Sequence, residues 1–319
     1  MHAQHTGIDD ATLSHARETV ARYLVATPLL AYGGAGLPVP VHLKYEGAQP
    51  TGSFKVRGAV AALSAYAAEG IPVVTASAGN HALGIAHAAG LLGVRATVVV
   101  PRNGSPAKIR ALREYPVDLV VEGDDYDGAE HHALALAESG MRYVSAYNDP
   151  HVIAGQSTLV AEVADSLGED FTVVVPTGAG GLVGGTALGA RRAARDIRVI
   201  GVESDACHAV SAAVTAGGVV RVPVGDTIAD GLVGNLEPGS ITPGIVRACG
   251  VRLVSVEEAA IRHAVREFAL GTGLIAEGSS AAALAALRTG LVPTDRPVVL
   301  IVSGRNIAPE LLAEILTEE

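Results

Sequence analysis

The chain has 319 residues, of which 49% are hydrophobic, so it can bury a sizeable core in one large domain or two medium ones. Its formal net charge is −10 and its few Lys and Arg residues are scattered, which argues against a nucleic-acid binder or a binder of anionic membranes. Cys207 and Cys249 have no CxxC spacing, which argues against a disulfide framework or a structural zinc site. The N-terminal stretch does not read as a signal peptide and no apolar run is long enough to span a bilayer, so we expect a cytoplasmic protein with a small-molecule partner.

Strand and helix signals alternate along the chain. Short β-branched runs predict strands at residues 41–46, 71–76, 95–101, 117–123, 142–147, 171–178, 198–203, 251–256 and 297–304. Ala- and Leu-rich segments with helical spacing lie between them, at residues 53–68, 80–91, 126–139, 154–167, 181–194, 256–270 and 279–288. Several strands are continuously apolar, which is typical of a parallel sheet covered by helices on both faces. The pattern predicts an open α/β fold, and no linker, charge run or repeat marks a domain boundary.

The loop after the second predicted strand is a candidate ligand site, because ligands of open α/β sheets lie beyond the carboxyl ends of strands. It reads Ser77, Ala78, Gly79, Asn80 and His81 and leads into a helix. Small residues there let backbone N–H groups approach an anion at the helix N-terminus. The alternative interpretation is that Ser77 or Asn80 simply caps the helix.

Two later turns are also candidates. Backbone donors for a phosphate are available in the glycine loop, which reads Gly178, Ala179, Gly180, Gly181 and Leu182. This loop is not a Walker A motif, since no GK[ST] follows, and it gives no clean GxGxxG, although Glu203 lies roughly where a dinucleotide site has its acidic residue. A dinucleotide site therefore stays open. The last buried strand ends at Ser303, Gly304, Arg305 and Asn306, which also reads as an ordinary strand-to-helix turn.

Seven segments in order carry a resemblance to a known family: TGSFKVRGA (51–59), SAGNH (77–81), TGAGGL (177–182), GVE (201–203), TIADGL (227–232), EGSSAAALAAL (277–287) and VSGRN (302–306). With YDGA (126–129) and NDPHVIAGQ (148–156), they resemble the serine/threonine dehydratase (ammonia-lyase) family of pyridoxal-phosphate (PLP) enzymes, which is related to serine racemase. The resemblance covers nearly the whole chain.

The resemblance implies a fold type II architecture of the tryptophan synthase β kind, with two open, twisted, mostly parallel sheets flanked by helices. A large PLP-binding domain would comprise residues 1–71 and 148–319, and a small mobile domain, residues 72–147, would be inserted in it. The family places PLP in the interdomain cleft, and its members are commonly homo-oligomers, either dimers or tetramers.

The resemblance also implies roles for individual residues. Lys55 would form the Schiff base with PLP, Asn80 would bind the ring hydroxyl, Ser303 would bind the ring nitrogen, and Phe54 would belong to the cofactor site. The phosphate would be bound by the glycine loop, namely Gly178, Ala179, Gly180, Gly181 and Leu182. The substrate carboxylate would meet the first loop, namely Ser77, Ala78, Gly79, Asn80 and His81.

Lys55 is expected in the first turn of its helix, where the positive end of the helix dipole disfavours a cation and an apolar cleft lowers the pKa further. A neutral amine can form an imine and then act as a base. We expect Lys44 and Lys108, in contrast, to be solvated surface charges. Because a serine hydroxyl, unlike a carboxylate, leaves the ring nitrogen neutral, Ser303 favours β-elimination. The expected reaction converts a β-hydroxy amino acid such as L-threonine or L-serine to a 2-keto acid and ammonia.

Four positions depart from the family pattern. Ala78 stands where racemases of the family carry a second serine, which disfavours racemisation. Ala209 stands where the family's divalent-cation site has a second carboxylate besides Glu203, so that metal site is in doubt. Ala179 and Arg305 both stand where glycine is usual. Arg305 is interpreted as a partner in a surface or interdomain ion pair rather than as a selector of a second substrate carboxylate.

Other functions stay open on the sequence. One is PLP-dependent β-replacement, in which a second substrate captures the elimination product, and another is an ammonia-lyase of the hydroxyaspartate type. A third, from a different class, is a non-catalytic nucleotide or amino-acid binding protein on a Rossmann-like sheet.

Overall fold

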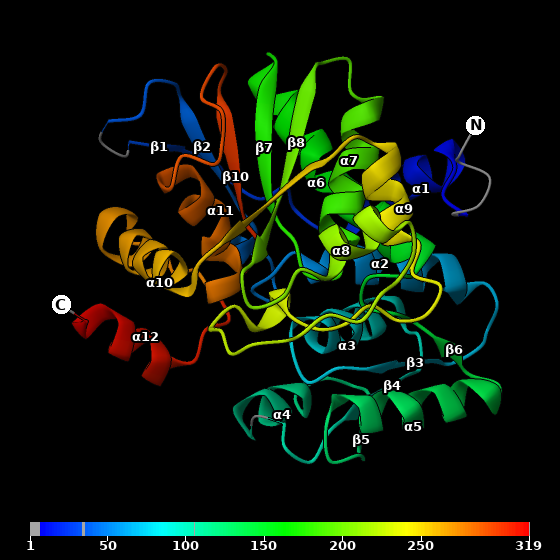
Figure 1. Ribbon diagram of the computed structural model, residues 1–319. Helices are drawn as coiled ribbons and strands as arrows, with labels where there is room; N and C mark the ends of the chain where they lie inside the picture. Colours follow the sequence, from blue (N-terminus) through cyan, green and yellow to red (C-terminus); the bar gives the residue numbers. More distant parts are fainter. Residues whose placement is uncertain (1–6, 34–35, 105, 319) are drawn as a thin grey trace. The chain divides into compact units, whose positions relative to one another are not determined.

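The computed structural model describes residues 7–33, 36–104 and 106–318 (Figure 1). Two compact units make up the chain. One contains the N-terminal segment as far as Val25 together with Gln49–Gln156, and the other contains Ala26–Ala48 and the chain from Ser157 onward. These boundaries differ from the expected domains, since the first unit includes helices on both sides of residues 72–147. The motion expected of residues 72–147 stays a prediction.

The first unit is built on a four-stranded parallel sheet in the order β5-β4-β3-β6. Its strands are β3 (Val73–Ala76), β4 (Ala96–Val100), β5 (Asp118–Val121) and β6 (Arg142–Tyr143). Its helices are α1 (Asp10–Tyr23), α2 (Lys55–Ala67), α3 (Asn80–Leu92), α4 (Pro106–Leu112), α5 (Tyr126–Glu138) and the first part of α6 (Pro150–Leu167). Helices α3 and α5 both pack on β3 and β4, and every residue of these two strands is buried, as a covered parallel sheet requires.

The second unit is built on a six-stranded sheet in the order β1-β2-β10-β7-β8-β9. Its strands are β1 (Leu29–Tyr32), β2 (Val41–Tyr45), β7 (Phe171–Pro176), β8 (Ile197–Ser204), β9 (Arg252–Val256) and β10 (Val298–Val302). Only the β1–β2 pair is antiparallel among these strands. Its helical segments are the rest of α6, α7 (Gly181–Arg192), α8 (Ala209–Ala216), α9 (Thr242–Ala248), α10 (Glu258–Glu267), α11 (Gly278–Arg288) and α12 (Pro309–Thr317), with short turns η2 (Glu46–Ala48), η3 (Asp230–Leu232) and η4 (Phe268–Thr272).

Helix α11 forms the centre of the second unit's core. It packs on β7, β8, β9 and β10, and all of its residues from Gly278 to Leu287 are buried. The small side chains in this stretch bring the helix close to the apolar strands, which pack densely against it. The start of α11 is thereby fixed beside the carboxyl ends of the strands.

The expected α/β architecture with two mostly parallel sheets is confirmed, and each predicted strand and helix is found with shifted ends. The elements that the sequence analysis did not predict are α1, β1, α4, α8, α9, α12 and the short turns η2 and η3. Apart from α1, these elements span nine residues or fewer, so their periodicity is weak.

Lys44 is not the solvated surface charge expected from the sequence. Its side chain is only 2% exposed, and its Nζ donates hydrogen bonds to the Thr27 carbonyl (2.7 Å) and to Glu162 Oε2 (2.5 Å). The expectation was wrong because Glu162, which lies on α6, makes a buried ammonium tolerable in β2, and a partner so distant along the chain leaves no local signal.

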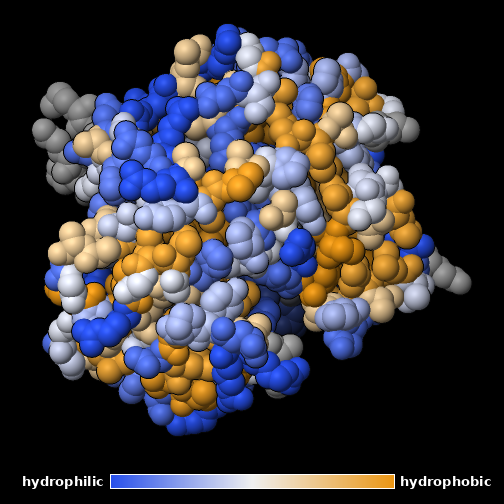
Figure 2. Space-filling view, turned by 180° about the vertical axis from the view of Figure 1, so that it is seen from behind, coloured by the Kyte–Doolittle hydropathy of each residue, from blue (hydrophilic) through white to orange (hydrophobic). Residues whose placement is uncertain are grey.

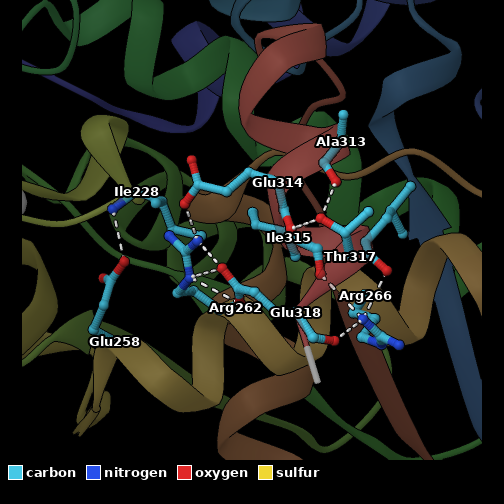
Figure 3. Close-up of polar contacts among 10 residues, drawn as sticks. Ile228, Glu258, Arg262, Arg266, Ala313, Glu314, Ile315, Thr317 and Glu318 are labelled. Carbon is cyan, nitrogen blue, oxygen red and sulfur yellow. Dashed lines mark hydrogen bonds and ion pairs between the residues drawn. The ribbon is translucent and has the colours of Figure 1, made fainter.

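Charged contacts join α10 to α12 (Figure 3). Arg262 pairs with Glu314 (2.5 Å) and with Glu318. Arg266 donates to the carbonyls of Ile315 (3.3 Å), Leu316 (2.7 Å) and Glu318. The last carbonyls of a helix have no partner within it, so Arg266 satisfies groups that would otherwise need water.

Apolar residues gather in several patches on the face shown in Figure 2, between hydrophilic ones. Val25 (89% exposed) and Leu270 (65%) are among the large apolar side chains left in solvent. Exposed apolar area of this kind is where protein contacts form. Among the described residues, no helix combines the length and apolarity needed to cross a membrane.

Candidate functional site

Lys55 is the first residue of α2, as predicted. The preceding Phe54 is the N-cap and offers no side-chain hydrogen bond to the helix. Lys55 Nζ donates to the Ala146 carbonyl (3.0 Å), just beyond β6, and lies 5.3 Å from the centre of the Phe54 ring. The ammonium is therefore held at a helix N-terminus, where the dipole opposes its charge.

The backbone around Lys55 is packed tightly by two glycines. A Cβ added at Gly84, on α3, would lie 3.1 Å from the Lys55 carbonyl carbon. A Cβ added at Gly155, on α6, would lie 2.6 Å from the Arg57 carbonyl oxygen. A Cβ at Gly155 would force α6 away from α2, and one at Gly84 would be crowded, so both glycines permit a close approach that fixes the start of α2.

The loop from Ser77 to His81 connects β3 to α3. Gly79 is the N-cap of α3, and this cap makes no side-chain hydrogen bond. The Ser77 hydroxyl instead accepts from the Gly79 N–H (3.1 Å) and so shapes the turn before the helix. The capping interpretation of this loop is therefore wrong, and an uncapped helix start of this kind favours an anion.

His81 is buried next to Lys55. Its Nε2 lies 3.2 Å from the Val144 carbonyl, and its Nδ1 has no hydrogen-bond partner among the described residues. Burial, reinforced by the charge of Lys55, lowers the pKa of His81 to about 3. The imidazole is therefore neutral near pH 7, donates through Nε2 and keeps a free acceptor at Nδ1.

The glycine loop lies between β7 and α7. Gly180 has a left-handed backbone (φ +89°), and a Cβ added there would lie 2.9 Å from Thr242 Cβ. The Thr242 hydroxyl donates to the Ala179 carbonyl (2.7 Å), while the first intrahelical bond runs from the Gly184 N–H to the Gly180 carbonyl (2.8 Å). The first-turn amides, which include those of Gly181 and Leu182, therefore lie outside the helical pattern and suit a phosphate.

The segment containing TIADGL supports this loop. A Cβ added at Gly178 would lie 2.5 Å from the Gly231 carbonyl oxygen, and the Gly231 N–H donates to Ser279 Oγ (2.9 Å). At the other end of the segment, Glu258 accepts from the Thr227 hydroxyl (2.5 Å) and from the backbone N–H that follows it (3.0 Å, Figure 3). A chain of contacts thus runs from α10 to the glycine loop.

Ser303 follows β10 and is buried. Its Oγ lies 3.0 Å from Ser280 Oγ, on α11. Ser280 Oγ also accepts from the Gly304 N–H (2.7 Å). Within the second unit, the turn that holds Ser303 and the segment that supports the glycine loop therefore both contact the start of α11.

Glu203 was considered as a metal ligand and Arg305 as a partner in an ion pair, and the structure gives each of them other hydrogen-bond partners. Glu203 Oε1 accepts from the backbone N–H groups of Val210 (2.9 Å) and Ser211 (3.3 Å), at the start of α8. No group of three or more His, Cys, Asp or Glu residues that could hold a metal is found in the described parts of the chain. The Arg305 guanidinium hydrogen-bonds Tyr45 and has no carboxylate partner among the described residues of its own unit.

The two units hold different parts of the predicted site. Phe54, Lys55 and the loop from Ser77 to His81 lie in the first, and the glycine loop and Ser303 lie in the second. The chemistry of each part fits a PLP group, because a lysine amine stands at one helix start and phosphate donors stand at another. The sequence analysis missed four supporting residues, Gly231, Thr242, Ser279 and Ser280. Three of them lie inside the segments TIADGL and EGSSAAALAAL, which carry the family resemblance. That resemblance marked each segment as a whole but assigned no role to these individual residues.

Comparisons with known proteins show the family to which the chain belongs. A family model described as "Pyridoxal-phosphate dependent enzyme" matches residues 20–304. The L-threonine ammonia-lyase of Geobacter sulfurreducens is 38% identical over 285 residues, which cover 88% of this chain and 70% of that protein. The catabolic L-threonine dehydratase of Escherichia coli K12 is 33% identical over 314 residues, 97% of this chain and 95% of that protein. The structure of maize serine racemase matches with a TM-score of 0.89 and 28% identity, covering 96% of each chain. The chain belongs to the family of pyridoxal-phosphate dependent enzymes.

Proposed function

We propose that the protein is a PLP-dependent ammonia-lyase that eliminates water from a β-hydroxy amino acid such as L-threonine or L-serine and yields a 2-keto acid and ammonia. The observation that carries this proposal is the placement of Lys55, whose amine stands at an uncapped helix start beside a neutral histidine. Two relatives similar over most of this chain, named L-threonine ammonia-lyase and L-threonine dehydratase, support the same reaction.

PLP, when bound, acts as an electron sink for the bonds at the substrate Cα. Lys55 would hold the cofactor through its amine, and Nζ, when free, would take the proton from the substrate Cα. The helix dipole disfavours the ammonium form of Lys55 and so promotes proton release from it in the next step. Because His81 is neutral, it adds no second positive charge beside that amine.

The other residues bind and orient. We propose that the first-turn amides of α7, with Gly178 and Ala179, bind the phosphate, and that Asn80 binds the ring hydroxyl. The uncapped start of α3 suits the substrate carboxylate, which meets the backbone amides of the loop and the Ser77 hydroxyl. Ser303 would bind the ring nitrogen and provides no negative charge to keep that nitrogen protonated, which would favour loss of the β-hydroxyl.

Racemisation is disfavoured by Ala78, which has no hydroxyl to return a proton to the opposite face. We further propose that residues 72–147 close over bound substrate and exclude water. A cytoplasmic location and a homo-oligomer of two or four copies complete the proposal.

Reduction with borohydride tests the cofactor link. Purified protein should absorb in the near-visible range, and reduction followed by peptide mapping should find the pyridoxyl label on Lys55. The Lys55→Ala variant should lose turnover and the label, while Lys108→Ala, a partly exposed lysine outside the site, should keep both. A colourless protein that takes up no added PLP would contradict the proposal.

A substrate panel separates the remaining reactions. L-threonine, L-serine and a β-hydroxyaspartate are each assayed for keto acid and ammonia, with and without an added thiol. Keto acid from the amino acid alone indicates the lyase, whereas a requirement for the thiol indicates β-replacement. Preference for the hydroxyaspartate would instead favour a role for Arg305, for which the described part of its own unit offers no carboxylate partner.

A further inference from the structure

Two buried hydroxyl groups face each other where β10 ends and α11 begins. Ser280 is 0% exposed and Ser303 is 3% exposed, and their Oγ atoms are 3.0 Å apart. A buried pair of this kind has few other hydrogen-bond partners. The direction of the hydrogen bond between the two groups therefore decides whether Ser303 donates to its ligand or accepts from it.

The neighbours of Ser280 determine where its proton can go. Ser280 Oγ accepts from the Gly304 N–H (2.7 Å), and its proton can be donated to the Gly304 carbonyl (2.8 Å) or to Ser303 Oγ. The Gly304 carbonyl already accepts from the Glu277 N–H (3.1 Å). Because the Glu277 N–H already pairs that carbonyl, Ser280 can donate its single proton to Ser303 without leaving the carbonyl unpaired.

The two possible directions give Ser303 opposite properties. If Ser303 accepts from Ser280, its own proton is left for another acceptor, such as the lone pair of an unprotonated pyridine nitrogen. If Ser303 donates to Ser280, it presents only lone pairs and would require a protonated ring nitrogen. Either direction gives a continuous chain of hydrogen bonds that polarise one another, so the direction is fixed by what Ser303 binds.

We propose that Ser280 is a positioning residue that holds the Ser303 hydroxyl as a donor toward the PLP ring nitrogen and thereby keeps that nitrogen unprotonated. The inference rests on the cofactor role proposed for Ser303. It assigns a role to Ser280 that the resemblance did not supply, since EGSSAAALAAL was recognised only as a segment.

The test uses apoprotein titrated with PLP labelled with 15N in the ring. Ser280→Ala should raise the dissociation constant for PLP about three- to tenfold, as expected for one lost buried hydrogen bond. It should also move the 15N resonance of the ring toward that of a free, weakly hydrogen-bonded pyridine. Ser280→Cys, which keeps the side-chain shape with a larger and weakly donating sulfur, should behave like Ser280→Ala, and it serves if the alanine variant does not fold.

A double-mutant comparison separates positioning from a general loss of structure. In a Ser303→Ala background, Ser280→Ala should cause no further rise in the dissociation constant, because its effect passes through Ser303. The control is Ser204→Ala, which removes another buried hydroxyl that accepts a backbone N–H (3.2 Å) and should leave both readouts unchanged.

Three results would overturn the inference. The first is an unchanged 15N resonance in Ser280→Ala, and the second is a Ser280→Cys variant with the wild-type dissociation constant and resonance. The third is an equal rise in the dissociation constant on Ser280→Ala in the wild-type and Ser303→Ala backgrounds. Failure of the proposed function is distinguishable, since the wild type itself would then show no PLP label on Lys55.

Discussion

Acidification should destabilise the first unit through His81. Burial and the charge of Lys55 hold its pKa at about 3, against an ordinary 6.5. Between pH 3 and pH 6.5 His81 is protonated in the unfolded chain but not in the folded protein. The stability that depends on neutral His81 is therefore fully present above pH 6.5 and is lost as the pH falls toward 3. At pH 4.5 the two values correspond to a loss of about 3 kcal/mol in the free energy of unfolding.

The assay compares urea unfolding of the apoprotein at pH 7.5 and pH 4.5 for the wild type and for His81→Asn. Asparagine can still donate to the Val144 carbonyl but does not titrate, so on acidification the variant should lose about 3 kcal/mol less of its free energy of unfolding than the wild type does. Lys55→Met removes the second cause and should move the pKa of His81 part of the way back, because burial remains. A histidine resonance that titrates near pH 6.5, or equal losses in both proteins, would refute the reasoning.

Three further perturbations test the second unit. Gly180→Ala should lower the free energy of unfolding by about 1–3 kcal/mol, since it combines a left-handed backbone with a crowded Cβ. Gly217→Ala (φ +75°, nearest atom 3.8 Å away) measures the backbone part alone in the same urea assay. Glu162→Gln should lower the free energy of unfolding by about 3 kcal/mol, because it leaves the buried Lys44 ammonium without its carboxylate. Lys44→Met combined with Glu162→Leu should recover most of that loss when both variants are compared by thermal unfolding. Glu258→Ala should weaken PLP binding in apoprotein titrations through loss of the contacts to the TIADGL segment, whereas Glu258→Gln, which keeps an acceptor there, should bind PLP almost as the wild type does.

The sequence predicted the α/β architecture well because it depends on local signals. The apolar runs that became β7 and β10 are long enough to identify buried parallel strands, and the glycines of the α7 loop identify a phosphate turn. β1 was not predicted because it is a four-residue edge strand without alternation of polar and apolar residues, and α9 was not predicted because it spans only seven residues.

The contacts that support the candidate site could not be predicted for a different reason. The partner of Ser303 is Ser280, and the partner of Lys44 is Glu162, which are 23 and 118 residues away along the chain. Such pairs depend on how strands and helices are brought together, and no periodicity in either segment encodes them. The expectation for Lys44 was wrong because it used the commonest local environment of a lysine, and the alternative interpretation of the Ser77 loop as a simple cap failed for the same kind of reason.

The glycine contacts on either side of α2 also have a consequence for hydrogen exchange. Gly84 and Gly155 bring two other helices against the backbone of α2 at its first residues. A helix held in this way cannot fray from its N-terminus without separating three helices at once. Deuterium uptake by the amides from Gly58 to Leu63 should therefore be slow and report opening of the whole unit, so that the mobility available to Lys55 is confined to its side chain.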